Sequence, residues 1–168
     1  MANLETISKI LTHPTWDVLV VFFFIAAGFF YGISSGKTKL IAVLFSLYVS
    51  AMIFENFSYL DFLTKDRPLF ETFLVRGAVF AILVLLLIIL FNKFLSRDYT
   101  SGTRVWWQIF LLSFLEVGLL MSLIFQLLPV KNLFAFSPVV ENIFASSQAF
   151  FWWLILPLVA LFVIIRKR

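Results

Sequence analysis

The sequence predicts an all-α fold: a polytopic transmembrane helical bundle with four or five spans. Of its 168 residues, 62% are hydrophobic and only 13% are charged, whereas a soluble domain carries about 25% charged residues. Several stretches approach the roughly 20 apolar residues that a helix needs to cross a bilayer. Most of the charges lie at the ends of these stretches. We therefore expect a lipid bilayer as the surroundings of the chain, and its length suits a single folded unit.

Residues 1–15 precede the first apolar stretch. Leu4, Ile7, Ile10 and Leu11 form one face of a short helix, with polar residues opposite. Such a pattern is typical of a segment that lies in the membrane interface. A cleaved signal peptide is not expected here, because no small-residue cleavage site follows the first span and further spans come after it.

Five spans are predicted in order. The second is short; it extends to about residue 60, is tilted, or is re-entrant. The fourth stops at Pro129, as a proline should stop a helix. The predicted spans cover residues 16–33, 40–54, 72–91, 105–128 and 149–165. The fifth is followed by a basic tail to residue 168, and Pro157 within it predicts a kink.

Between the fourth and fifth spans, residues 129–148 mix polar side chains with scattered aromatic and aliphatic ones. This pattern indicates an amphipathic connector that lies on the outer surface rather than crossing the membrane. Tryptophans lie near the predicted span ends and are interpreted as interfacial anchors. They are Trp16, Trp106, Trp107, Trp152 and Trp153.

The distribution of lysine and arginine predicts an orientation. Eight of these residues fall in the loops after spans one and three and in the C-terminal tail, against five on the other side. Positive loops face the cytoplasm. The N-terminus is therefore predicted outside and the C-terminus in the cytoplasm.

Several function classes are excluded by the residues themselves. The chain has no cysteine and one histidine, so we expect no thiolate or histidine-rich metal site. No Ser-His-Asp set, phosphate loop or pair of carboxylates is present, so we expect neither an enzyme nor a cofactor. The net charge of +4 sits at span ends, where lipid headgroups explain it, so no nucleic-acid partner is expected.

Glycines recur every fourth position at the end of the first span, at Gly28, Gly32 and Gly36. Residues four apart share a helix face, and small residues let membrane helices approach closely. We predict a helix-packing strip. Gly36 has a second interpretation as the end of the helix, since the segment SSGK reads as a turn.

Glu116 lies near the centre of the fourth span, where a charged side chain costs at least about 3 kcal/mol. Three interpretations stay open for it: a structural polar contact, with the carboxyl protonated or hydrogen-bonded, a proton or ion relay, and a docking site for a partner subunit. Other polar residues of this span share about half of its circumference with Glu116. They are Gln108, Ser113, Ser122 and Gln126.

Asp17 and Arg76 are predicted at similar depth near the outer ends of spans one and three. Either they form an ion pair between helices, or Asp17 caps its helix while Arg76 extends to the headgroups.

The layout of residues 16–128 resembles the colicin V production protein (CvpA) family of bacterial inner-membrane proteins. The resemblance is carried by an acidic opening (WDVLVV), a glycine-spaced exit into a second span (GISSGKTKLIAVLFSLYVSAMIF), an arginine-glycine in the third span (FLVRGAVFAILVLLLIILFN), and a loop (YTSGTRV) before the fourth. In this chain a fifth span at residues 149–168 follows, after the connector at 129–148.

The resemblance implies a role in colicin or toxin production or export and in envelope maintenance. Such a protein would act as a helical scaffold or interaction subunit, with a second copy of the chain or another membrane protein as partner. The alternative is a small channel or transporter subunit that uses Glu116 and the two glutamines of span four.

Overall fold

The computed structural model describes residues 16–95 and 106–166. The predicted interfacial segment at residues 1–15 and the basic residues Arg97, Arg104, Lys167 and Arg168 lie outside this part. Within it, 88% of residues are helical and none is in a strand. Five of the helices are long and apolar enough to cross a membrane. The predicted fold class is confirmed, and the chain is a multi-pass membrane protein whose surroundings are a lipid bilayer.

The five long helices correspond to the five predicted spans. They are α2 (Trp16–Ser35), α3 (Lys37–Glu55), α5 (Leu69–Leu95), α6 (Trp106–Leu127) and α8 (Ser147–Arg166). Short elements connect them at one end of the bundle: α4 (Tyr59–Thr64), the 3-10 turn η1 (Val130–Asn132), α7 (Pro138–Val140) and the π-helical turn η2 (Glu141–Ala145).

The second span is longer than the sequence predicted. α3 has 19 residues and begins at Lys37, with only Gly36 between it and the end of α2. Gly36 makes this possible with φ of 84°, a conformation that glycine adopts without a steric cost. Its N–H still donates to Gly32 O at 2.8 Å, so the chain turns without losing the last hydrogen bond of α2. A re-entrant segment is therefore not needed to explain the second span.

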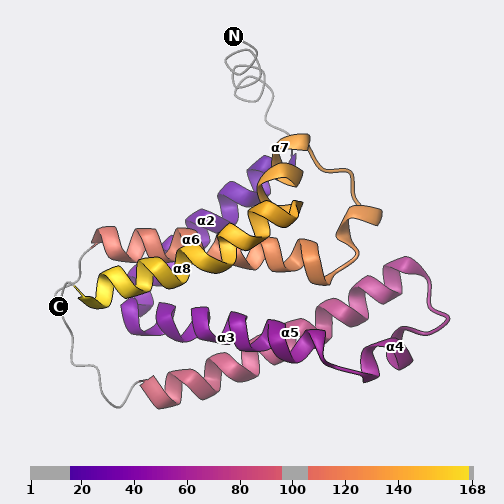
Figure 1. Cartoon of the computed structure of the whole chain (residues 1–168), viewed down its shortest axis with the longest axis horizontal. Helices are drawn as coiled ribbons and strands as arrows, with labels where there is room; N and C mark the ends of the chain where they lie inside the picture. The colour runs from indigo at the N-terminus through magenta and orange to yellow at the C-terminus, as the bar shows by residue number, and fades with distance from the viewer. Residues whose placement is uncertain (1–15, 96–105, 167–168) are drawn as a thin grey trace, which may run out of the picture.

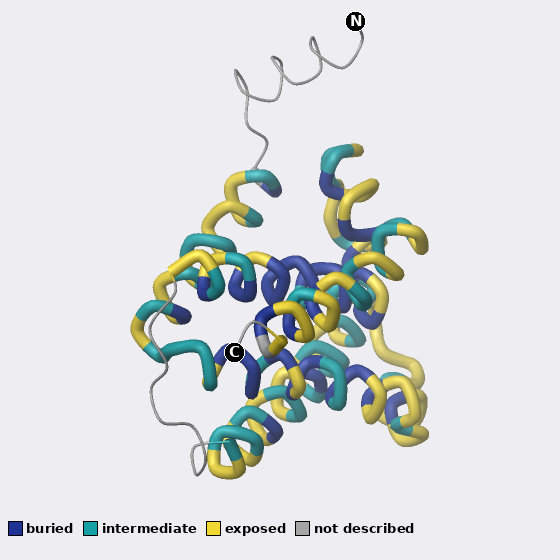
Figure 2. Tube along the Cα trace, turned by 60° about the vertical axis from the view of Figure 1, so that its left-hand side comes forward, coloured by how far each residue is buried: buried dark blue, intermediate teal, exposed yellow. Residues whose placement is uncertain are grey.

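The helices are arranged around α6. α3 and α5 lie side by side (Figure 1), and α3 and α8 both pack on α6. The Tyr48 hydroxyl of α3 also donates to Leu154 O of α8. α2 covers α6 and the edge of α3. Buried residues gather in the middle of the assembly and exposed ones along its periphery (Figure 2). α6 is the most buried of the five long helices, and α2 and α5 are the least buried.

α3 shows how the sequence directs this packing. Its buried side chains recur at intervals of three and four residues, which places them in one stripe along the helix. They include Leu40, Leu44, Leu47, Ala51 and Phe54. Two serines between them are also fully buried. Ser46 satisfies its hydroxyl locally by donating to Ala42 O at 2.7 Å, as serines in apolar helices commonly do.

The connector between α6 and α8 packs into the bundle instead of only lying on its surface. Val140, Phe144 and Ala145 are buried, and η2 contacts both α6 and α8. Ser137 caps α7 by accepting from Val140 N at 3.4 Å, with Pro138 at the first helical position. The predicted connector is thus part of the core at its buried positions.

Candidate functional site

The polar residues of α6 form no single row of contacts. Gln108, Ser122 and Gln126 each bond to another segment, whereas Ser113 Oγ is buried without a partner among the described residues. At the start of the helix, Lys37 Nζ donates to Gln108 Oε1 at 3.1 Å. This bond ties the α2–α3 turn to α6. Lys37 was predicted only as a topology-determining charge, and nothing in the sequence pattern points to this contact across 71 residues.

At the other end of α6, Ser122 and Gln126 hold the connector. The buried Ser122 Oγ donates to Phe144 O at 3.0 Å, and Gln126 Nε2 donates to Ala145 O at 3.4 Å. Lys131 Nζ donates to the same carbonyl at 3.0 Å. These bonds satisfy carbonyls of the π-helical turn that would otherwise be buried without a partner, which is costly in a bilayer.

Glu116 differs from these residues. It lies about 15 Å from either end of α6, and only 8% of it is exposed. Within residues 16–95 and 106–166, no hydrogen bond or ion pair reaches its carboxyl group. A buried carboxyl group without partners is unfavourable, so Glu116 is the ionisable residue of α6 that its own surroundings do not stabilise.

Two of the three glycines of the first span lie against α6. A Cβ at Gly28 would come within 2.7 Å of Val117 Cγ2, and one at Gly32 within 2.6 Å of Ser113 Oγ. Only glycine allows this close approach of α2 and α6. Gly36 takes no part in the packing, because a Cβ there would meet no atom within 4 Å. The strip predicted over three glycines is therefore corrected to two, and Gly36 serves the turn.

A third close approach joins α6 to α8. A Cβ at Gly118 would lie 2.0 Å from Trp153 Cζ3. The indole is held in place, since it stacks on Phe144 with ring centroids 5.6 Å apart and donates from Nε1 to Ile143 O at 2.8 Å. Trp153 was interpreted as an interfacial anchor; in the structure it is half-buried and also packs between α6 and η2. Trp152, next to it, is exposed and fits that role.

Asp17 and Arg76 do not form the predicted ion pair. Only 3% of Asp17 is exposed. Its Oδ2 accepts a hydrogen bond from the backbone N–H of Ser137 at 2.6 Å. Its Oδ1 accepts from Val18 N at 3.0 Å. The carboxylate thus ties the start of α2 to the connector. The backbone of a distant loop is a partner that side-chain spacing alone cannot indicate.

This bond leads to a first prediction. Asp17→Asn keeps the size of the side chain but loses the negative charge, which favours both the N–H bond and the position in the first turn of α2. We expect a loss of about 1–2 kcal/mol in the free energy of unfolding, measured by denaturant titration in detergent. Glu71→Gln, which removes an exposed acidic residue from the first turn of α5, is the control. Equal stability of the two variants would contradict the proposed weight of the Asp17–Ser137 bond.

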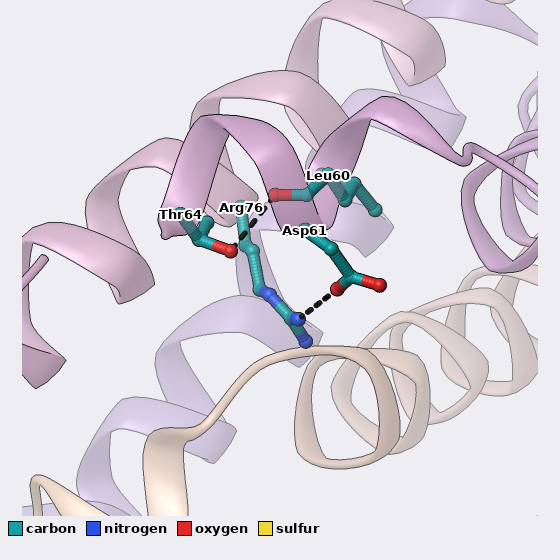
Figure 3. A network of polar contacts seen from close by, with 4 residues as sticks. All are labelled: Leu60, Asp61, Thr64 and Arg76. Atoms are coloured by element: carbon teal, nitrogen blue, oxygen red, sulfur yellow. Dashed lines mark hydrogen bonds and ion pairs between the residues drawn. The ribbon is translucent and has the colours of Figure 1, made fainter. Parts of the chain in front are cut away.

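Arg76 instead points to α4, where its Nη2 lies 3.6 Å from Asp61 Oδ1 (Figure 3). The two residues line a hollow of about 510 Å³ at the end of α3, α4, α5 and α6. Glu55, Asn56 and Gln126 add further polar atoms to its wall. Among the described residues, the hollow and Glu116 hold ionisable groups that the packing of the helices leaves largely unused, and the hydroxyls of Ser50 and Ser113 are buried without a partner.

The bundle, its apolar exterior and its buried polar contacts define a multi-pass helical membrane protein. No family model matches the chain, and searches of curated proteins and of solved structures find no match either. No group of three or more potential metal ligands is found among the described residues.

Proposed function

We propose that this chain is a non-enzymatic scaffold or interaction subunit of a bacterial inner membrane, with its N-terminus outside and its C-terminus in the cytoplasm. The layout of the spans, which is similar to that of the colicin V production proteins, supports this proposal. On the same basis we propose a role in toxin production or export and in envelope maintenance. The partner is a second copy of the chain or another membrane protein.

The observation that carries the scaffold proposal is how the polar residues of α6 are used. Gln108 is bonded to Lys37 and Gln126 to Ala145, so both glutamines hold structural elements together. Ser122 does the same through Phe144 O. A transport path along α6 would need these groups free to exchange partners with a substrate. Their engagement favours a rigid scaffold over a channel.

A second candidate rests on Glu116 alone. Its carboxyl group is buried near mid-helix and has no partner among the described residues. Ionisable residues at that depth are commonly part of proton or ion pathways. A small channel or transporter subunit therefore remains the alternative function.

One experiment separates the two. The full chain is reconstituted in liposomes with a trapped pH-sensitive dye, and in parallel is purified from its membrane in mild detergent after chemical cross-linking. The scaffold proposal expects no proton flux above protein-free liposomes and a cross-linked partner of fixed stoichiometry. Flux that survives in Q108A and Q126A but disappears in Glu116→Gln would reject the scaffold and support the relay.

A further inference from the structure

The hollow beside Arg76 has a suitable size and position to bind part of a membrane lipid. Its volume is about 510 Å³, within the range of roughly 300–1,000 Å³ that ligand sites in proteins occupy. Arg76 lies about 10 Å along α5 from Leu69. The guanidinium is therefore below the end of its helix, where headgroups meet acyl chains.

The donors of Arg76 are largely uncommitted. The 3.6 Å separation from Asp61 is an ion pair but is too long for a hydrogen bond. Arg76 Nε is buried, so the N–H groups of its two Nη atoms are the donors left for a ligand. Because a guanidinium offers five N–H donors in a planar fork that matches phosphate oxygens, this site favours a phosphate group.

The acidic residues of the wall decide which phosphate compound fits. Glu55 and Asp61 bring two negative charges against the single positive charge of Arg76. An entirely anionic ligand would meet repulsion from them. The side chain of Asp61 is 93% exposed, so its carboxylate can accept a cation while Arg76 holds the phosphate. A group with a phosphodiester and a primary ammonium satisfies both charges.

The surroundings favour a lipid as the source of this group. Tyr59 and Phe62 precede and follow the hollow-lining residues Leu60 and Asp61 in α4. They are 69% and 79% exposed, and in a bilayer such side chains contact acyl chains. We propose that the hollow binds the phosphoethanolamine headgroup of a phospholipid, with the phosphate on Arg76 and the ammonium on Asp61. This inference does not depend on the scaffold function.

The test measures lipid retention on the full chain. Protein in nanodiscs containing equal amounts of phosphatidylethanolamine, phosphatidylglycerol and phosphatidylcholine is released into detergent, and bound lipid is counted by native mass spectrometry. We expect selective retention of phosphatidylethanolamine. Arg76→Gln should weaken it about tenfold, the effect of losing one good charge-assisted contact. Asp61→Asn should reduce the preference over phosphatidylglycerol.

Arg67→Gln is the matched control, because it removes the same charge from an exposed pair with Glu71 at the same end of α5. It should retain lipid like the unaltered chain. Equal loss in Arg67→Gln and Arg76→Gln, or equal retention of the three lipids by the unaltered chain, would overturn the proposal. The second comparison needs no variant, so it holds even where Arg76→Gln fails to fold. If equimolar soluble glycerophosphoethanolamine displaced the bound lipid, the inference that the headgroup comes from a membrane lipid would be rejected.

Discussion

Gly118→Ala is expected to destabilise the bundle by about 3 kcal/mol or more, at the upper end of the cost of overpacking a core. The added methyl group would lie 2.0–2.4 Å from three ring atoms of Trp153. The indole cannot rotate away cheaply, because its N–H bond to Ile143 O and its stacking on Phe144 would both be lost. The loss should appear as a lower unfolding midpoint in detergent.

The control for Gly118→Ala is Gly77→Ala. A Cβ at Gly77 would meet only Leu128 Cδ1, at the ordinary distance of 3.9 Å. Alanine also favours a helix over glycine by about 1 kcal/mol. We therefore expect Gly77→Ala to be neutral or slightly stabilising. If both variants melt alike, the contact between α6 and α8 is looser than the structure has it.

Glu116→Leu is expected to raise the free energy of unfolding, by about 1–3 kcal/mol, because it removes a buried polar group that has no partner. Leucine is of similar volume, so the surrounding packing is kept. Replacing a buried ion pair by well-packed apolar residues is likewise often neutral or stabilising. Glu71→Leu is the control, because it makes the same change at an exposed carboxylate. A lone surface ion pair contributes little to stability, so we expect the free energy of unfolding to change little.

The Glu116 result also decides between the interpretations of that residue. A variant that is more stable but inactive would mean that the carboxyl group is kept for function rather than for folding. A Glu116→Leu chain that unfolds more easily, with Glu116→Gln unaffected, would instead show that the group makes a hydrogen bond essential to the fold, and our assignment of it as unpartnered would be wrong.

The helices could be predicted from the sequence because bilayer crossing depends on local composition. Long apolar runs bounded by charges, Pro129 and the glycine turn placed five spans close to where the structure has them. The start of α3 was missed by three residues, since Lys37 and Lys39 look polar although the helix has already begun. The spacing of Gly28 and Gly32 indicated a close-packed face, but spacing does not reveal which helix lies opposite.

The contacts of the polar residues could not be predicted in the same way. Asp17 bonds to a backbone 120 residues away, and Arg76 meets a residue of a short helix that no periodic pattern marks. Gly118 was passed over because a single glycine carries no pattern, and its role is visible only once Trp153 lies across it. Each of these depends on which segments meet, and that is decided by the packing of the whole bundle.

α5 also has a consequence for the membrane itself. Its uncharged stretch between Arg76 and Lys93 is only about 25 Å long, against roughly 30 Å of hydrocarbon in a typical bilayer. Such a hydrophobic mismatch is relieved by local thinning or by flanking side chains that reach outward. Because Arg76 lines the hollow and its Nε is buried, its charge is held near that depth. The bilayer has to adapt to α5, and the chain is expected to prefer thinner membranes.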